Sequence, residues 1–225
     1  MNNKINLLIP CAGSGSRFGV EIPKQYVHLQ DITILEHTLN IFLEISQIDN
    51  IFIVVKKEDK YIDRYKKISS KINILRVGGE TRSESVYNGL FQINSQYDDW
   101  IMIHDAVRCC ITKPIVMRLI NTVKNDNVGG IVAVPIVDTI KKISSDGTMS
   151  TLDRNSLYLA QTPQMFRFGL LKQALSYAKN LKNLTDEASS IEELGYKIKL
   201  VQGCNTNIKL TLVDDLKFIK SLIGI

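Results

Sequence analysis

Apolar runs alternate with helical repeats along the first 135 residues of the chain. Short apolar runs that end in polar or small residues predict buried strands, whereas apolar residues spaced three and four apart predict helices. The predicted strands cover residues 5–9, 51–55, 72–77, 100–103 and 130–136, and the predicted helices cover residues 33–45, 59–69, 81–93 and 113–124. Alternation at this density predicts an α/β fold in which helices flank a parallel sheet, a three-layer sandwich.

The pattern changes between residues 138 and 157. Here Asp146-Gly147 separates two short alternating runs, which is typical of a β-hairpin. With no helix to cover it, such a hairpin exposes apolar residues unless another chain covers them, so the segment is either a dimerisation arm or a surface flap. We interpret it as a dimerisation arm. Further helices at 167–179, 186–194 and 214–222 and short strands at 197–201 and 207–210 complete a single domain over residues 1–225.

Composition and charge narrow the classes of function. No apolar run reaches the roughly 20 residues needed to cross a bilayer, and the amino terminus is unlike a signal peptide. We therefore expect a cytoplasmic protein without a membrane partner. The net charge of +5 is spread along the chain instead of forming a patch, which argues against a nucleic-acid partner. The four cysteines lack the spacing of metal ligands, and we expect reduced thiols.

The loop after the first predicted strand has the residues of a polyphosphate site. Gly13, Gly15 and Gly19 leave backbone N–H groups open to anionic oxygens, and Arg17 and Lys24 add two cations. A tight turn would also account for the glycines. The glycine spacing differs by one residue from the dinucleotide fingerprint, and the loop lacks the Gly-Lys-Ser/Thr ending of a P-loop, so neither standard motif fits.

Candidate partners of this loop follow later strands, because ligands of such sheets lie at the carboxyl ends of the strands. Residues 78–85 follow the third strand, where small residues and the Ser85 hydroxyl can admit a flat base or simply cap a helix. Asp105 follows the fourth strand; its carboxylate suits Mg²⁺, directly or through water, or caps the next turn. Lys209 lies in an apolar run and is either solvated or, near an anionic site, functional.

Six short blocks occur together in an order that is typical of one known family. They cover residues 10–17 with 23–26, 104–108, 153–157, 161–164, 185–189 and 207–209. On these blocks the chain resembles the 2-C-methyl-D-erythritol 4-phosphate cytidylyltransferases of the non-mevalonate isoprenoid pathway, over nearly its whole length. Ribitol-5-phosphate cytidylyltransferases share the opening loop, the His-Asp-Ala-Val-Arg block and Thr-Pro-Gln. The blocks at 153–155 and 185–189 favour the methylerythritol enzyme.

The resemblance implies a fold, a reaction and a set of roles. It implies a Rossmann-like nucleotidyltransferase sheet with an inserted β-hairpin arm, and a homodimer whose sites are shared between chains. The reaction would transfer CMP from CTP to methylerythritol phosphate, by in-line attack of the acceptor phosphate on the α-phosphorus, with Mg as cofactor. By the resemblance, Arg17 and Lys24 stabilise the transition state, and Arg154 and Lys209 position the sugar phosphate.

The remaining positions are assigned to the two substrates and the metal. CTP would be surrounded by Ala12, Gly13, Gly15, Gly79, Glu80, Ser85 and Asp105, the acceptor would meet Arg108, Thr139, Arg154, Thr162 and Lys209, and Mg would meet Asp105. Three positions depart from the family pattern: Cys11, Phe18 and Cys109 stand where alanine, methionine and proline are more usual. None of them removes a charged group assigned to the reaction. A nucleotide-sensing module would keep the glycine loop but would have little use for cations at 154 and 209.

Overall fold

The computed structural model describes residues 3–13, 22–178 and 181–224. In this part of the chain seven strands form one sheet in the order β11-β7-β10-β6-β1-β4-β5. Neighbouring strands run parallel except at β10, which is antiparallel to both β6 and β7. The strands are β1 (Ile5–Pro10), β4 (Ile48–Val54), β5 (Ile72–Leu75), β6 (Trp100–Ile103), β7 (Gly129–Pro135), β10 (Tyr158–Arg167) and β11 (Lys199–Gln202).

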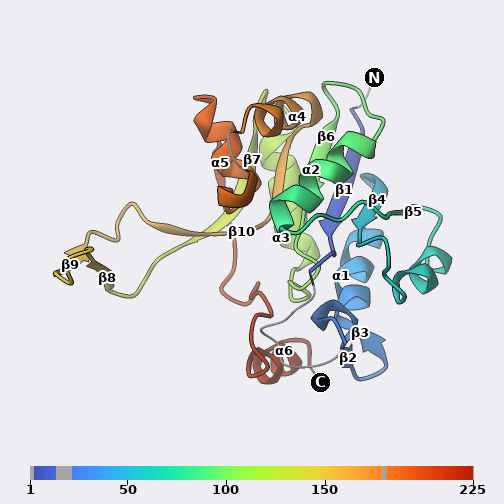
Figure 1. The fold of residues 1–225 in the computed structure, drawn as a ribbon, viewed down its shortest axis with the longest axis horizontal. Helices are drawn as coiled ribbons and strands as arrows, with labels where there is room; N and C mark the ends of the chain where they lie inside the picture. Colours follow the sequence, from blue (N-terminus) through green and yellow to red (C-terminus); the bar gives the residue numbers. More distant parts are fainter. Residues whose placement is uncertain (1–2, 14–21, 179–180, 225) are drawn as a thin grey trace.

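Helices cover both faces of this sheet, which confirms the predicted three-layer sandwich (Figure 1). One face carries α1 (Ile34–Leu43), α3 (Lys113–Val123) and α6 (Asp215–Leu222), and the other carries α2 (Arg82–Gln92), α4 (Phe168–Tyr177) and α5 (Glu187–Glu193). The central strand β1 shows why both faces must be covered. Leu7 and Ile9 pack into the first core and Leu8 into the second, and all three are fully buried.

Shorter elements connect these layers. They are η2 (Lys24–Tyr26), β2 (His28–Leu29), β3 (Ile32–Thr33), η3 (Ile62–Lys67) and η4 (Leu181–Asn183). Strands β2 and β3 pair with one another as a small antiparallel hairpin next to α1. In the stretch 59–69, for which a helix is predicted, only the 3-10 helix η3 forms.

Two predictions at the sheet were incomplete or wrong. Strand β10 was not predicted, because its centre is the polar and proline-containing run Gln161–Gln164 and its first residues are exposed. The strand predicted at 207–210 does not form. This segment is instead tied to its neighbours by side-chain bonds: the Asn207 amide donates to Gln161 and to the carbonyl of Thr162.

The predicted hairpin is present and extends away from the sheet. Strands β8 (Ile140–Ile143) and β9 (Met149–Leu152) pair antiparallel, with Ile143 opposite Met149. Figure 1 shows this pair at the end of a long arm, far from the helices. Ile143 and Met149 are 69% and 63% exposed. The prediction of a dimer depends on such exposed apolar side chains, because a second chain could cover them.

Within the described ranges, no helix is both long and apolar enough to span a bilayer.

Candidate functional site

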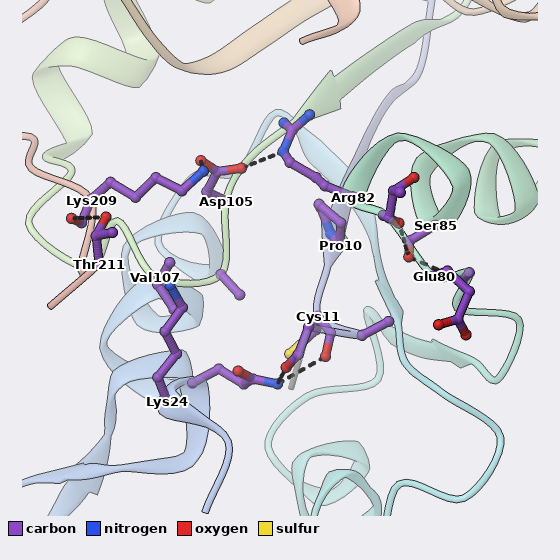
Figure 2. Close-up of a pocket in the computed structure, with 16 residues that line it drawn as sticks. Pro10, Cys11, Lys24, Glu80, Arg82, Ser85, Asp105, Val107, Lys209 and Thr211 are labelled. Atoms are coloured by element: carbon purple, nitrogen blue, oxygen red, sulfur yellow. Dashed lines mark hydrogen bonds and ion pairs between the residues drawn. The ribbon is translucent and has the colours of Figure 1, made fainter. Parts of the chain in front are cut away.

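A cavity of about 300 Å³ lies where the loops after β1, β5 and β6 meet. It brings together eight of the residues predicted from the sequence: Ala12, Gly13, Lys24, Gly79, Glu80, Ser85, Asp105 and Lys209. These residues come from separate parts of the chain, and Figure 2 shows Lys209 and Asp105 pointing toward one another, with Lys24, Ser85 and Glu80 on the surrounding elements. The residues predicted to bind ligands thus lie together near the carboxyl ends of the strands, where ligands of such sheets bind.

A second cavity of about 200 Å³ adjoins the first. It contains the predicted residues Arg108 and Thr162, and it shares Arg82, Asp105 and Lys209 with the larger cavity. The two cavities thus form a larger and a smaller lobe that meet at one acidic and two basic side chains. Such a junction suits a reaction in which two phosphate groups must approach one another.

Four predicted residues remain. Gly15 and Arg17 lie outside the described residues. Thr139 and Arg154 belong to the arm and its base, and neither lines either cavity. The Arg154 guanidinium donates to the backbone carbonyl of Val137. In a single chain these two residues are therefore held away from the cavities.

The described residues directly after β1, 11–13, are tied to a glutamine. The buried Gln25 amide donates to the carbonyl oxygens of Cys11 at 3.0 Å and Gly13 at 3.2 Å. A Cβ placed on Gly13 would meet no atom of the described residues within 4 Å, and Gly13 lines the cavity. Beside it, the Lys24 Nζ donates to the carbonyl of Leu210 at 2.8 Å. The loop can therefore present bare backbone and a cation to an anionic ligand.

The start of α2 forms the opposite wall of the larger cavity. The side chain of Thr81 and that of Glu84 form a capping box at this helix start. The Gly79 N–H donates to Ser85 Oγ at 3.1 Å, and Ser85 Oγ donates to the carbonyl of Thr81 at 2.8 Å. Glu80 lies at the rim, where its 80% exposed side chain pairs with Lys56.

Glycine is required where the two loops touch. A Cβ on Gly78 would lie 2.4 Å from the Cβ of Ala12 and 2.8 Å from the backbone carbon of Val55. Real atoms do not approach so closely, so any larger residue would push the β5–α2 loop away from the loop after β1. The small residues after β5 therefore set the width of the cavity.

Asp105 lies at the centre of a cluster of cations. Its Oδ1 accepts from Arg82 Nε at 2.6 Å, and its Oδ2 lies 2.9 Å from Lys209 Nζ and 3.5 Å from Arg108 Nε. Burial alone would raise the pKa of Asp105, but Arg82, Lys209 and Arg108 outweigh it and hold that pKa well below its usual value. The carboxylate is therefore ionised throughout the physiological range.

His104 precedes Asp105 and is kept neutral. Burial lowers the pKa of His104 to about 3. Its Nε2 lies 3.3 Å from the carbonyl oxygen of Arg108, which can only accept, so Nε2 carries the proton. Its Nδ1 then accepts from the Thr162 hydroxyl at 3.2 Å, and that hydroxyl accepts the Asp105 N–H at 3.0 Å. His104 therefore orders the loop and does not exchange protons near neutral pH.

Two residues of the cluster were missed from the sequence. Arg82 lies inside the small-residue stretch after β5 but was given no role, and Glu187 lies in the block 185–189 without one. The two form a buried pair 105 positions apart, with Nη1–Oε1 at 2.7 Å and Nη2–Oε2 at 3.0 Å. No local pattern signals such a pairing. The Thr-Asp-Glu-Ala-Ser block at 185–189 marks Glu187 as part of a family motif, but it does not indicate which residue pairs with it.

A magnesium site built by the protein alone is not present in the described part of the chain. No group of three or more His, Cys, Asp and Glu side chains there could hold a metal ion. Asp105 has about four lone-pair positions on its carboxylate, and cations contact it at three points. It can therefore supply one oxygen ligand, which fits a Mg²⁺ ion held mainly by substrate phosphates and water.

Comparison with known proteins supplies an independent assignment. The family model described as "IspD: 2-C-methyl-D-erythritol 4-phosphate cytidylyltransferase" matches residues 5–224. A Chromobacterium violaceum protein named 2-C-methyl-D-erythritol 4-phosphate cytidylyltransferase is 42% identical over 218 residues, 96% of each chain. A Neisseria meningitidis serogroup C protein of the same name is 43% identical and covers 100% of this chain and 99% of its own.

Solved structures agree with these relatives. A crystal structure of a 4-diphosphocytidyl-2C-methyl-D-erythritol synthase superposes with a TM-score of 0.87 at 38% identity, covering 99% of both chains. The Francisella tularensis 2-C-methyl-D-erythritol 4-phosphate cytidylyltransferase superposes with a TM-score of 0.82 at 36% identity, covering 97% of this chain and 99% of its own. The likeness extends over the whole fold and is not confined to the opening loop.

Proposed function

Because the chain belongs to the 2-C-methyl-D-erythritol 4-phosphate cytidylyltransferase family, we propose that it transfers CMP from CTP to 2-C-methyl-D-erythritol 4-phosphate. The products are 4-diphosphocytidyl-2-C-methyl-D-erythritol and pyrophosphate. The observation that carries the proposal is the pair of adjoining cavities that share Arg82, Asp105 and Lys209. The family model and the relatives named above favour this acceptor, and none of them favours ribitol 5-phosphate.

An oxygen of the acceptor phosphate attacks the α-phosphorus of CTP in line. The new P–O bond forms as the bond from the α-phosphorus to its bridging oxygen breaks, and pyrophosphate leaves with that oxygen. The second pKa of a phosphate monoester is about 6, so the nucleophile is already ionised at neutral pH and no general base is required. The neutral, fully hydrogen-bonded His104 agrees with a site that moves no proton.

The main task of such a site is to offset crowded negative charge. In the proposed assignment Arg17 and Lys24 stabilise the charge that develops on the leaving pyrophosphate. Lys209 lies where both cavities meet, so its ammonium group can contact the donor and the acceptor phosphates.

Each substrate is assigned to one cavity. Ala12, Gly13, Gly15, Gly79, Glu80, Ser85 and Asp105 would surround CTP, and Arg108 and Thr162 would contact the acceptor in the smaller cavity. The Nε of Arg108 is buried and makes no hydrogen bond among the described residues, and its ion-pair partner Asp105 Oδ2 lies 3.5 Å away, so this donor can still form a hydrogen bond with an incoming anion.

We propose Mg²⁺ as cofactor, with Asp105 as its single protein ligand, directly or through water. When bound, the ion would neutralise charge on the triphosphate. The chain's own contribution is a carboxylate whose low pKa keeps it ionised and available. A cytoplasmic location stays a prediction, and it agrees with CTP as the donor.

We also propose a homodimer whose sites are shared between chains. Thr139 and Arg154 lie outside both cavities of their own chain, and the arm that carries them extends into solvent (Figure 1). Apolar side chains at its tip and base, Ile143, Met149, Val137 and Leu159, are between 56% and 69% exposed. A second copy that covers these side chains would bring Thr139 and Arg154 to the acceptor lobe of its neighbour.

The test is release of pyrophosphate from CTP with each acceptor in turn. We expect rapid release with methylerythritol phosphate, slow release with ribitol phosphate, and dependence on added Mg²⁺. Faster release with ribitol phosphate would reassign the acceptor. If neither acceptor yields pyrophosphate while CTP still binds, the chain is a nucleotide-binding module instead of an enzyme.

A further inference from the structure

Glu187 is a buried carboxylate outside both cavities. It is the first residue of α5 and is 2% exposed. It lines neither the larger nor the smaller cavity, so it cannot touch a substrate that occupies them. A buried carboxylate destabilises a fold unless it is paired, and Glu187 is paired with a residue that does line both cavities, Arg82.

The geometry of this pair fixes the direction of the Arg82 side chain. Both terminal nitrogens of the guanidinium donate to Glu187, one to each carboxylate oxygen, at 2.7 Å and 3.0 Å. Two parallel bonds hold the plane of a guanidinium group in a way that one bond does not. With its terminal nitrogens held, Arg82 has its Nε left to donate to Asp105 Oδ1, at 2.6 Å.

Asp105 connects the held Arg82 side chain to Lys209 at the junction of the two cavities. Its other oxygen lies 2.9 Å from Lys209 Nζ, so a continuous chain of contacts links Glu187, Arg82, Asp105 and Lys209. The charges alternate in sign along this chain. Without Glu187, the free end of Arg82 could turn and take both oxygens of Asp105, which would draw the carboxylate away from Lys209.

We propose that Glu187 is a positioning residue for the phosphoryl-transfer step. By clamping Arg82 it holds Asp105, and through Asp105 it holds Lys209, at the junction of the two cavities. The inference rests on the proposed cytidylyl transfer, because that reaction is what places phosphates at this junction. Glu187 itself contacts no reacting atom.

The first test is Glu187→Gln, which keeps the size of the side chain but removes its charge and the two-point clamp. We expect kcat to fall roughly 10²-fold, the loss that a misplacement of about 1 Å can produce. CTP affinity, measured by calorimetry, should stay near the wild-type value. The matched control is Glu192→Gln, the same change at an exposed position of the same helix, which should leave kcat unchanged.

A double-variant cycle separates positioning from general stability. If Glu187 acts through Arg82, adding Glu187→Gln to Arg82→Gln should lower kcat no further than Arg82→Gln alone. An equal loss in both backgrounds, or wild-type turnover in Glu187→Gln, would overturn the proposal. Failure of the wild type to release pyrophosphate would instead refute the proposed function, so the two failures are distinguishable.

Should Glu187→Gln fail to fold, Glu187→Asp takes its place. The shorter side chain keeps the charge but cannot reach both nitrogens of Arg82 unless the arginine moves. We expect a lower kcat at a melting temperature close to that of the wild type. Wild-type turnover in this variant would mean that the position of Arg82 does not matter to the reaction, and would overturn the proposal.

Discussion

Asp105 allows three cations to stay close together before any substrate binds. Arg82, Arg108 and Lys209 all contact its carboxylate, and in its absence they would repel one another in a partly buried space. Donors that are already in place need no reorganisation when negative charge develops on the substrates. The carboxylate is therefore first an organiser of positive charge at the proposed site.

His104 gives a prediction about pH and stability. Its pKa is about 3 in the folded protein and near 6.5 in an unfolded chain, so below pH 6.5 the unfolded state binds more protons. Stability should therefore fall as pH falls from 7 to 5, with a slope that approaches about 1.4 kcal/mol per pH unit from this group. Urea denaturation at pH 7, 6 and 5 measures it.

The control for that prediction is His104→Asn, which removes the titrating group. Since Glu187, whose pKa is raised by burial, titrates in both proteins, the difference between their slopes isolates His104. The variant should lose the extra slope between pH 7 and 5, whatever its absolute stability. Identical slopes in the two proteins would show that His104 titrates normally in the folded state.

At the level of single residues, the sequence predicts best where a side chain directly follows a strand. Ala12, Gly13 and Asp105 lie two or three positions after the end of a strand, and the topology of a parallel sheet is enough to bring them together. Arg82 and Glu187 depend on a contact across 105 positions, and their role was missed because neither residue has a local signature. The opening loop alone indicates a polyphosphate; the acceptor side depends on such distant contacts.

Among the elements, the start of α2 is where a helix cap and the proposed CTP site coincide. Thr81→Ala removes the hydroxyl that accepts the Glu84 N–H and so breaks the capping box. We expect a loss of about 1 kcal/mol in the free energy of unfolding. We also expect weaker CTP binding, because the same turn orients Gly79 and Ser85. Urea denaturation and CTP titration are the measurements.

Helix α3 offers the matched control. It also begins after a threonine, Thr112, but that side chain makes no capping bond. Thr112→Ala should therefore leave both stability and CTP affinity near the wild-type values. If Thr112→Ala lowers stability and CTP affinity as much as Thr81→Ala does, the capping box at α2 contributes nothing to either quantity.

Helices and strands were predicted correctly where buried residues recur with a clear period along the sequence. They were not predicted correctly where a segment is held by side-chain hydrogen bonds or is only partly buried. Strand β1 is an apolar run apart from the buried Asn6, because both of its faces are covered. Strand β10 passes from solvent into the core, so its exposed start and polar centre obscure the pattern. The stretch 207–210 has apolar residues but is held by the Asn207 side chain, which no periodicity predicts.

At the scale of the whole molecule, the arm formed by β8 and β9 has no packing partner among the described residues of its own chain. Its strands are exposed on both faces, and their apolar side chains contribute nothing to either core. A two-stranded ribbon is marginally stable by itself. The proposed homodimer would account for the arm, because a second copy would cover these side chains and receive Arg154 at its acceptor site.

Mixing two inactive variants tests this arrangement. Lys24→Ala damages the body of one chain, and Arg154→Ala damages the arm of the other. If each site combines one body with the partner's arm, every mixed dimer contains one intact site and one doubly damaged site. Because random exchange makes half of the dimers mixed, an equal mixture should recover about a quarter of wild-type activity.

The measurement is pyrophosphate release before and after the two variants are allowed to exchange subunits, with mixed dimers quantified by mass spectrometry. Mixing either variant with itself is the control and should recover nothing. If mixed dimers form but activity does not return, each site is built from a single chain, and Arg154 must then reach the acceptor by a rearrangement of its own arm. Recovery in proportion to the mixed dimers would instead make the dimer the catalytic unit, because no chain alone would hold Lys24 and Arg154 at one site.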